Sequence, residues 1–282
     1  MEALVAKKRI SLSGSIDDYP EGIIIPIDKP YRWTSADVIR KIKYAAIRHF
    51  DKKNLKVGHA GTLDPLATGV LLVCIGKATK LAGELQNHDK EYIAGISFGA
   101  TTPSYDREKD IDRRYPLDNV SAESIADILP DFLGEQEQVA PLFSAKSVDG
   151  IRAYELARKE WKNSRRDGSA FDHSAESLLN KQAINISEIE LLYFGSRTRT
   201  DHPEPGKINI IDISELGLPH ADIRVRCSKG TYVRALARDL GEALGSGAFL
   251  DDLRRTGNGG FKVEDALSME DAMSILQPAS RL

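Results

Sequence analysis

Hydrophobic and polar positions along the chain alternate between the patterns of strands and of helices. Short apolar runs bounded by glycine, proline or charged residues are typical of strands, and apolar residues at every third or fourth position are typical of amphipathic helices. The apolar runs predict strands over 22–27, 70–75, 92–98, 184–194 and 221–227. The periodic segments predict helices over 34–46, 121–133, 231–244 and 269–276, with a short helix opening at 76–80.

The start of the first long helix has a clear local signal. Asp28-Lys29-Pro30 breaks the preceding strand, and Thr34 and Ser35 then offer helix caps, with Asp37 in the first turn. Three polar stretches predict irregular structure: a charge-rich connector at 103–116, a long loop or insertion at 161–182, and a loop at 195–220 around a short apolar run.

Composition excludes several classes of protein. The 282 residues are 41% hydrophobic and 29% charged, which is ordinary for a globular protein, and the net charge of −3 argues against a nonspecific nucleic-acid coat protein. No run of about 18 apolar residues predicts a membrane span, and the first residues lack the apolar core of a secretory signal. We therefore expect a cytoplasmic protein.

The cysteines and the glycine motifs bear on cofactors. Cys74 and Cys227 lie within or at the end of strand-like runs, so we expect two reduced, half-buried thiols. No Cys/His spacing indicates a metal site, and neither a dinucleotide-binding fingerprint nor a P-loop is present. We expect no cofactor.

The most informative stretch is Gly58–Gly69, GHAGTLDPLATG. It places His59 and Asp64 among three glycines, with Pro65 directly after the acid. Glycines permit tight loop conformations and close approach of a ligand, and proline disfavours a helix at the residue before it. Asp64 is therefore expected on a stiff, exposed loop, in an arrangement that contributes nothing to a core and indicates a site.

This stretch resembles the Gly-His-x-Gly-Thr/Ala-Leu-Asp-Pro-x-Ala-x-Gly signature of the TruB family of pseudouridine synthases. Further blocks of the family pattern match in Cys227–Arg234 and in the segments 245–250 and 253–256. The resemblance covers roughly residues 20–270. It departs from the family at Arg32, where glycine is usual, and at Lys146, which stands one place early in the pattern.

The resemblance implies a fold and a domain organisation. It implies an α+β pseudouridine-synthase fold, with a central, mostly antiparallel sheet, flanking helices and an RNA-binding cleft. Residues 1–20 are then a polar lead-in and 21–270 the catalytic domain, in which about 134–182 form a mobile insertion that grips RNA. The remaining 271–282 are a short tail, too short for the small RNA-binding PUA domain that many members carry.

The resemblance also implies an activity: isomerisation of uridine to pseudouridine at position 55 in the T-loop of tRNA, after the base flips out of its stack. Asp64 matches the catalytic aspartate, and Arg234 the arginine that pairs with it. Tyr92 matches the tyrosine that stacks on the target base and is suited to handling its proton. The partner implied is the T-arm of tRNA; no protein partner is implied, and we expect a monomer.

Four further residues match substrate-binding positions of the family. His59 matches the histidine that contacts the RNA where the base leaves its stack. Tyr232 and Leu253 match positions that line the uracil pocket. Lys80 matches the last residue of a Gly-x-Ala-Thr-Lys motif, where a structural or electrostatic role and an RNA contact are both open.

Two local concentrations of basic residues, at 146–166 and 224–238, could bind phosphates, with Arg152, Arg158 and Arg226 as candidates. Two other functions stay open. The chain could be a non-enzymatic tRNA-binding or tRNA-folding factor on the same fold. It could also be a small-molecule enzyme whose glycine-rich loop cradles a phosphate, but the missing P-loop residues count against this alternative.

Overall fold

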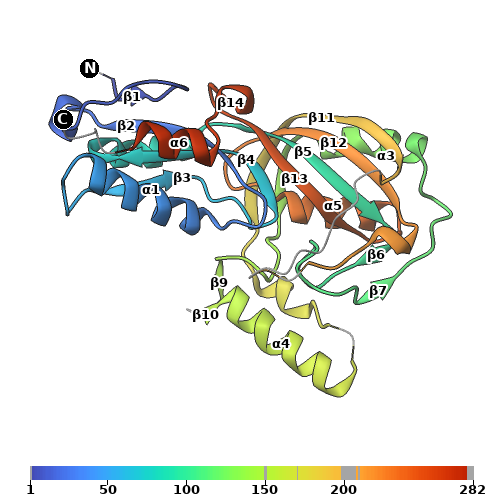
Figure 1. Ribbon diagram of the computed structural model, residues 1–282. Helices are drawn as coiled ribbons and strands as arrows, with labels where there is room; N and C mark the ends of the chain where they lie inside the picture. The colour runs from blue at the N-terminus through green and yellow to red at the C-terminus, as the bar shows by residue number, and fades with distance from the viewer. Residues whose placement is uncertain (1, 149–150, 170, 198–207, 209, 278–282) are drawn as a thin grey trace. The chain divides into compact units, whose positions relative to one another are not determined.

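The computed structural model describes residues 2–148, 151–169, 171–197, 208 and 210–277. The chain divides into two compact units (Figure 1): unit 1 comprises residues 1–92 and 254–282, and unit 2 comprises residues 93–253. The chain passes between the units within two strands, β5 (Lys90–Phe98) and β13 (Ala248–Asn258). Within the described residues, every helix is too short or too polar to span a lipid bilayer.

The centre of unit 1 is strand β4 (Ala67–Ile75), which pairs antiparallel with β2 (Ile23–Lys29) on one edge and β3 (Val57–Ala60) on the other. The register places Gly69 opposite Lys29 at one end of β4, and Ile75 opposite both Ile23 and Val57 at the other. The strands β1 (Leu4–Val5) and β14 (Phe261–Lys262) extend the pairing, β1 parallel to β2 and β14 antiparallel to β13.

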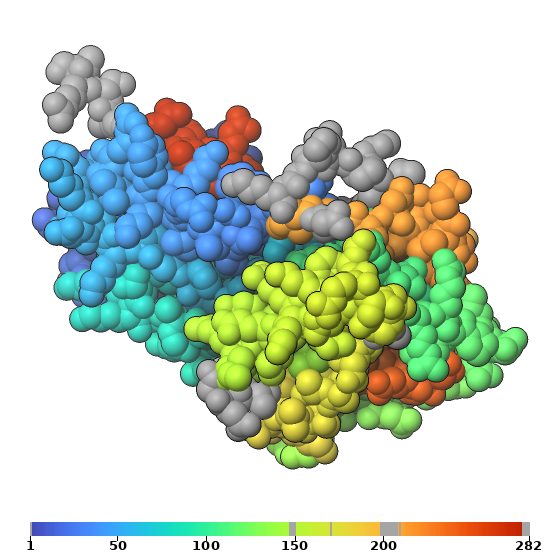
Figure 2. Space-filling model, turned by 90° about the horizontal axis from the view of Figure 1, so that it is seen from below, coloured from blue at the N-terminus to red at the C-terminus, as the bar shows by residue number. Residues whose placement is uncertain are grey.

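Helices cover the strands of unit 1. Helix α1 (Ser35–His49) forms an outer surface of the unit, shown in blue in Figure 2, and buries Val38, Ile42, Ala45 and Ala46 on its apolar face. Thr34 caps it as predicted: its hydroxyl accepts from the Asp37 amide, and the Asp37 carboxylate accepts from the Thr34 amide. The remaining helical elements of unit 1 are η1 (Ile16–Asp18), η2 (Gly76–Leu81), α2 (Ala82–Asn87), η6 (Val263–Asp265) and α6 (Met269–Ile275).

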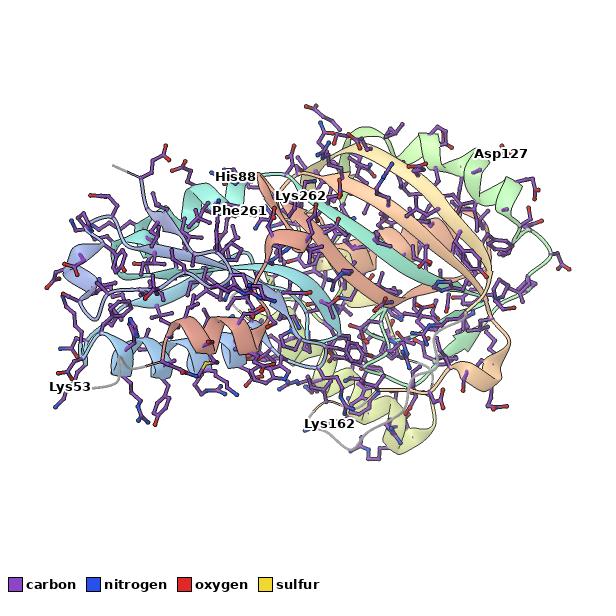
Figure 3. All side chains as sticks on the ribbon, turned by 45° about the horizontal axis from the view of Figure 1, so that its top comes forward. Lys53, His88, Asp127, Lys162, Phe261 and Lys262 are labelled. Atoms are coloured by element: carbon purple, nitrogen blue, oxygen red, sulfur yellow. The ribbon has the colours of Figure 1, made fainter. Side chains whose placement is uncertain are left out.

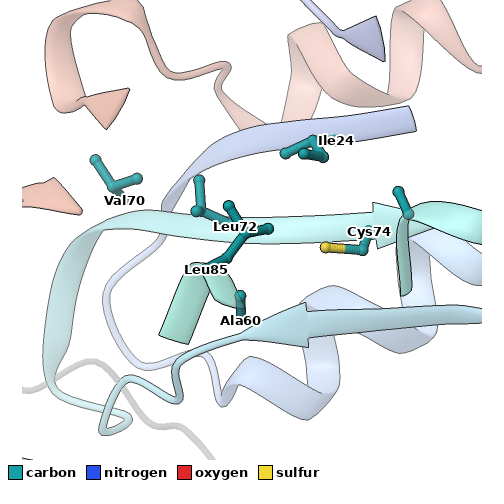
Figure 4. Close-up of a cluster of buried hydrophobic side chains, with 7 residues drawn as sticks. Ile24, Ala60, Val70, Leu72, Cys74 and Leu85 are labelled. Carbon is teal, nitrogen blue, oxygen red and sulfur yellow. The ribbon is translucent and has the colours of Figure 1, made fainter. Parts of the chain in front are cut away.

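One face of β4 carries a core cluster (Figure 4). Val70, Leu72 and Cys74 alternate along the strand and point to one side because successive strand residues face opposite sides of a sheet. They pack with Ile24 of β2 and Leu85 of α2, and with Ala60 and Ala78. Cys74 and Cys227 are fully buried, not half-buried as expected. Burial also raises the pKa of the Cys74 thiol to about 11, so this thiol is an inert part of the core.

Both ends of the predicted domain differ from expectation. The first residues are part of unit 1 and not a separate polar lead-in: β1 pairs with β2, and Ala6, Leu12 and Ile16 are buried. At the other end, the predicted boundary at 270 falls inside α6, which packs against α1 and β2 and buries Ala272 and Ile275. Single apolar residues scattered among polar ones make these contacts. Neither segment therefore stands out as hydrophobic in its overall composition.

Unit 2 is built on a long strand, β11 (Gln182–Ser196). Its first part pairs with β8 (Gly134–Gln138) and most of its length with β12 (Pro219–Cys227), both antiparallel. The other elements of the unit are β6 (Ala100–Thr101), β7 (Arg113–Arg114), α3 (Ala122–Ile128), η3 (Leu129–Phe132), β9 (Ser147–Val148), β10 (Ile151–Arg152), α4 (Ala153–Asp167), η4 (Ser174–Leu178), η5 (Ser214–Leu216) and α5 (Val233–Ala243). Mixed α and β structure with mostly antiparallel pairing is confirmed in both units.

The predicted loop at 161–182 is wrong over residues 161–167. Helix α4, which lies beside β9 and β10 in Figure 1, continues to Asp167, and Gly168 ends it in the left-handed conformation with φ of 74°. Its narrow apolar face is enough to anchor it: Ala153 and Ala157 are buried in a cluster with Leu142, Phe171 and Leu179, against which Trp161 packs. Most residues of the segment are polar and lie on the other faces of the helix, as Lys162 does in Figure 3. They outnumber the apolar residues, so the helical spacing of the apolar residues was not recognised in the sequence.

A buried polar cluster ties the segment after α4 to the rest of unit 2. The His173 ring bonds Asp112 through Nε2 at 3.1 Å and the Tyr105 hydroxyl through Nδ1 at 2.9 Å, and its Nδ1 lies 3.3 Å from Glu176. Glu176 also accepts from Arg238 of α5 at 3.0 Å. With Phe171 and Tyr115, the cluster lines a cavity of about 470 Å³.

A second histidine in unit 2 is held in the same way. His220 bonds Asp251 through Nδ1 at 2.7 Å and Asp222 through Nε2 at 3.1 Å. Burial disfavours the charged form of both His173 and His220, but the bonded carboxylates outweigh it and raise the pKa of each to about 9.

These two histidines predict how stability depends on pH. An unfolded histidine has a pKa of about 6.5, so both groups stabilise the fold fully below that pH and lose their contribution as pH rises through 9. Each loss should be on the order of 2–3 kcal/mol. Urea unfolding at pH 6, 7.5 and 9.5 should show the decline in the native chain, a shallower decline in His173→Gln or His220→Gln, and an unchanged profile in His88→Gln. A flat native profile would contradict the prediction.

Candidate functional site

The loop between β3 and β4 carries the candidate aspartate. Asp64 has no helical or strand conformation, as predicted, but it is half-buried and not exposed as expected. Gly61 and Gly69 bracket the loop with φ of 86° and 101°, values that favour glycine. A turn closes directly after the acid, where the Ala67 amide donates to the Asp64 carbonyl at 3.1 Å. The backbone at Asp64 is therefore fixed on both sides.

A buried arginine holds one side of this loop. Arg255 of β13 is 1% exposed, and its guanidinium donates to the carbonyls of Val70 at 2.7 Å, Gly61 at 3.1 Å and Thr62 at 3.5 Å. The strands also meet closely: a Cβ placed on Gly69 would lie 2.1 Å from the Arg255 carbonyl oxygen. Glycine at 69 is required for this approach as well as for the positive φ.

A buried lysine holds the other side. The Lys29 ammonium is fully buried and donates to the carbonyls of Pro30 at 2.9 Å, Trp33 at 2.5 Å and Pro65 at 3.2 Å. Burial lowers the pKa of Lys29 to about 8, although the negative charge of Asp64 opposes the shift. Lys29 is thus a cation close enough to Asp64 to feel its charge. Sequence reasoning treated it only as the end of a strand, and the strand in fact runs through it.

Arg32 explains the departure from the family pattern. It keeps the left-handed conformation that the usual glycine would take, with φ of 63°. Its amide donates to the Pro65 carbonyl at 3.0 Å, the same oxygen that Lys29 contacts. The turn geometry is therefore preserved, at the cost of a conformation that side chains other than glycine disfavour.

Two further contacts complete the support. The Ser35 hydroxyl exchanges hydrogen bonds with the backbone of Leu63, accepting from its amide at 3.0 Å and donating to its carbonyl at 3.1 Å. Arg254 forms a bidentate ion pair with Asp28, at 3.1 and 2.7 Å, and also donates to the Thr68 hydroxyl. The loop is held through its backbone from residue 61 to residue 70.

His59 lies in β3, half-buried, on the strand that leads into the loop. Burial lowers the pKa of its imidazole, and the positive charge of Arg255 lowers it further, so the ring is neutral at pH 7. Its Nδ1 is buried and has no hydrogen-bond partner among the described residues. Because this atom is covered by protein, any contact of the ring with a ligand is made through its exposed part.

The other two predicted residues of unit 1 differ in exposure. Tyr92 lies near the start of β5 and is 8% exposed, so most of its ring is covered by protein. Lys80 lies in η2 and is exposed.

Unit 2 brings together the remaining candidates around the start of α5. Arg234 is 6% exposed, and its guanidinium donates to the carbonyls of Ser104 and Phe143, each at 3.1 Å. Its Nε also lies 3.8 Å from Asp106. These contacts hold the guanidinium rigidly in place.

Tyr232 directly precedes α5 and is fixed through its backbone. Its amide donates to the Gln138 side chain at 2.8 Å, and the Gln138 amide group donates to the Tyr232 carbonyl at 3.2 Å. Its ring packs on the apolar cluster that anchors α4. Leu253 lies in β13 and is 6% exposed. Because Asp64 belongs to unit 1 and Arg234 to unit 2, their pairing stays a prediction.

The arginines predicted to bind phosphate differ in the contacts that their side chains make. Arg226 forms an ion pair with Glu188 of the neighbouring strand at 2.8 Å, and both side chains are partly exposed, so its phosphate contact stays a prediction. Arg158 lies over the ring of Tyr154, with 5.3 Å from its guanidinium carbon to the ring centre, and Arg152 is exposed before α4. Lys146, displaced in the family pattern, donates to the Gln182 side chain. Among the described residues, no three His, Cys, Asp or Glu side chains are arranged to hold a metal ion.

Family models match nearly the whole chain. The model described as "TruB family pseudouridylate synthase (N terminal domain)" matches residues 48–233, and that described as "tRNA pseudouridylate synthase B C-terminal domain" matches residues 234–279.

Curated relatives agree with the family models. The tRNA pseudouridine synthase B of Phocaeicola vulgatus is 47% identical over 253 residues, which cover 90% of this chain and 92% of the relative. The tRNA pseudouridine synthase B of Clostridium kluyveri is 36% identical over 90% of this chain and 74% of its own length.

Solved structures support the fold. A chain of the Cbf5–Nop10–Gar1 complex matches 97% of this chain with a TM-score of 0.57 and 24% identity. A chain of an H/ACA RNP bound to a substrate RNA matches 95% with a TM-score of 0.56 and 23% identity. This chain spans 63% and 61% of those two chains, respectively.

The Arg255 contacts predict a large and specific loss of stability. Lysine keeps the charge at 255 but cannot reach three carbonyls with a rigid fork of donors, so Arg255→Lys should lower the free energy of unfolding by about 2–4 kcal/mol. Arg254→Lys, which changes a partly exposed pair, should cost about 1 kcal/mol or less. Urea unfolding measures both, and similar losses in the two variants would contradict the assigned role.

The backbone conformation of Arg32 predicts that replacing it by glycine increases the stability of the fold. Arg32→Gly removes the strain of a positive φ and should raise the free energy of unfolding by about 0.5–1 kcal/mol, after the greater freedom of glycine in the unfolded chain is subtracted. Arg40→Gly, within α1, should lower it by about 1 kcal/mol. Thermal and urea unfolding test the opposite signs; a loss at 32 would show that the arginine side chain makes contacts worth more than the strain.

Proposed function

The chain belongs to the TruB family of pseudouridine synthases and is a tRNA pseudouridine synthase, and we propose that its target is the uridine at position 55 in the T-loop of tRNA. The observation that carries this proposal is the loop around Asp64. The family signature coincides with a loop whose backbone is held by four side chains, those of Asp28, Lys29, Ser35 and Arg255. Rigid placement of one carboxylate is what an aspartate-dependent reaction needs.

The reaction itself is an isomerisation. The bond between N1 of uracil and C1′ of ribose breaks, the base turns, and a bond forms between C5 and C1′. The C5 proton leaves and N1 gains a proton, so atoms balance without a co-reactant. The Asp64 carboxylate acts at the junction of ribose and base, by attack or by stabilising the charge that develops there.

The surroundings of Asp64 support this role. Lys29 supplies a buried positive charge beside the loop, and the mutual attraction stabilises the carboxylate as it stabilises the ammonium. The Lys29 ammonium is committed to three carbonyls, so it cannot swing onto the substrate. Lys29 is therefore a positioning residue and not a proton donor.

Arg234 and Tyr92 complete the proposed catalytic set. The guanidinium of Arg234, immobilised by two carbonyls, is suited to pair with Asp64 when the site is assembled. The family motif assigns the ring of Tyr92 to stack on the detached uracil, a contact worth about 1–3 kcal/mol for any base. Its phenol would relay the C5 proton, releasing the hydroxyl proton as the oxygen takes up the new one.

The substrate must be turned out of its stack before it reaches Asp64, which costs a few kcal/mol. We assign the neutral ring of His59, which is half-buried on the strand leading into the loop, to the space that the base vacates. Tyr232 and Leu253 line the uracil pocket, and Lys80 contacts phosphate from its exposed position in η2.

Asp64→Asn tests the proposal most directly. Asparagine preserves size but removes the charge and the nucleophile, so turnover on T-arm RNA should fall by about four powers of ten. Binding should stay within about tenfold, since the stacking and phosphate contacts remain. The assay maps pseudouridine by position in unmodified tRNA and in the T-arm stem-loop.

The matched control is Glu84→Gln, the same charge change at an exposed residue of unit 1, and it should leave turnover unchanged. A rate in Asp64→Asn close to that of the native chain would refute the catalytic assignment. Pseudouridine at a position other than 55 would refute the proposed target, and absence of turnover in the native chain would favour the tRNA-folding factor.

A further inference from the structure

Lysines gather at one end of unit 1, at the opposite end of β4 from the Asp64 loop. They come from three segments that are separate in the sequence: α1, the loop between α1 and β3, and η2. All are exposed, and Lys53 lies beyond the end of α1 in Figure 3. The set, here called the lysine surface, is Lys43, Lys52, Lys53, Lys56, Lys77 and Lys80.

The lysine surface is hollowed by two adjoining grooves, each of about 490 Å³. Asn54, Leu55, Lys56 and Thr79 line both of them. One groove is also bordered by Val57 and Gly58, on the strand that carries His59. The grooves are therefore continuous with the strand that leads into the Asp64 loop.

The charge of the surface is largely uncompensated. Among the described residues that line the grooves, Asp17 alone is acidic, and it bonds Lys52 at 2.9 Å. Within the described part of the chain, the other five lysines form no ion pair. Ammonium groups gathered in this way repel one another, in a chain whose net charge is −3. A polyanion bound in the grooves would relieve that repulsion and release counterions.

The distance to the Asp64 loop is set by the strands. Gly69, near the start of β4, lies at the end of the strand next to that loop, and Ile75 at the other end is followed at once by η2 and its lysines. Six residues of strand span about 20 Å. A uridine seated at Asp64 brings its neighbouring nucleotides to the loop, and about 20 Å is the rise of roughly six base pairs, so a contact there lies beyond those neighbours.

We propose that the lysine surface binds the phosphate backbone of tRNA outside the T-arm. The inference rests on the proposed function, and it extends the RNA footprint along β3 and β4 to the opposite end of unit 1. RNA is favoured over an acidic protein because the grooves border the strand of His59, and because their donors are flexible point charges that suit phosphates without reading sequence.

The experiment compares two RNAs: unmodified full-length tRNA and the T-arm stem-loop. Lys53, Lys56 and Lys77 are replaced together by Gln, in an Asp64→Asn background so that the RNA is not converted during titration. The control replaces Lys7, Lys8 and Arg9 by Gln, an equal loss of charge at exposed residues of the same unit. Affinity is measured by fluorescence anisotropy from 50 to 300 mM salt, and melting temperatures check the fold.

The proposal expects full-length tRNA to bind the lysine triple at least tenfold more weakly, with a salt slope shallower by about two to three units, because each lost phosphate contact removes about 0.7–0.9 units. Stem-loop affinity should stay within twofold, and the control triple should bind both RNAs as the parent does. If the triple variant melts early, the single Gln variants carry the same test with about one unit of slope each.

Three results would overturn it. Unchanged tRNA binding would leave the surface to another anion, such as an acidic protein. An equal loss on the stem-loop would place the lysines in the T-arm site, and an equal loss in the control would indicate general attraction. Failure of the proposed function is separately visible, since it appears as absence of pseudouridine at position 55 in the native chain, while the binding comparison stays readable.

Discussion

The candidate site depends on two cations buried against backbone carbonyls. Arg255 and Lys29 together contact the carbonyls of residues 61, 62, 65 and 70, on either side of Asp64. Burying a charge is costly unless hydrogen bonds replace its hydration, and here each cation has three carbonyl acceptors. The same bonds satisfy loop carbonyls that would otherwise lose water. Cation and loop therefore require each other, and neither arrangement is stable alone.

This mutual requirement explains the backbone constraints nearby. Gly69 must lack a side chain because β13 brings Arg255 against β4, and Arg32 must accept a positive φ because its amide shares the Pro65 carbonyl with Lys29. The supports come from residues 28–35 and 254–255, far apart in the sequence. The shape of the Asp64 loop therefore depends on contacts with β2, β4 and β13, and not on its own local sequence alone.

The sequence predicted what local patterns encode and missed what depends on tertiary contact. Strand periodicity, the Thr34 helix cap and the non-helical Asp64 before proline follow from neighbouring residues, and the structure has them. The burial of Lys29 and Arg255 could not be predicted from their neighbours in the sequence, because it depends on a sheet that joins distant segments. Helix α4 was missed for a related reason: two alanines and a tryptophan anchor a helix whose other residues are mostly polar. The only local signal for Lys29 and Arg255 was their place in or beside family motifs.

The two ends of β4 use positive charge in opposite ways. Near Gly69 the cations are buried, bonded to fixed acceptors and unable to move, which suits a group that must position a carboxylate within a fraction of an ångström. Beyond Ile75 the lysines are exposed and mostly without acidic partners, which suits attraction of a flexible polyanion but fixes nothing. A buried cation would be useless for capture because it is already bonded, and an exposed lysine would be useless for positioning because its four-carbon stem is free. The two ends of β4 therefore differ in what their cations can do, with fixed placement at one end and freedom to meet a polyanion at the other.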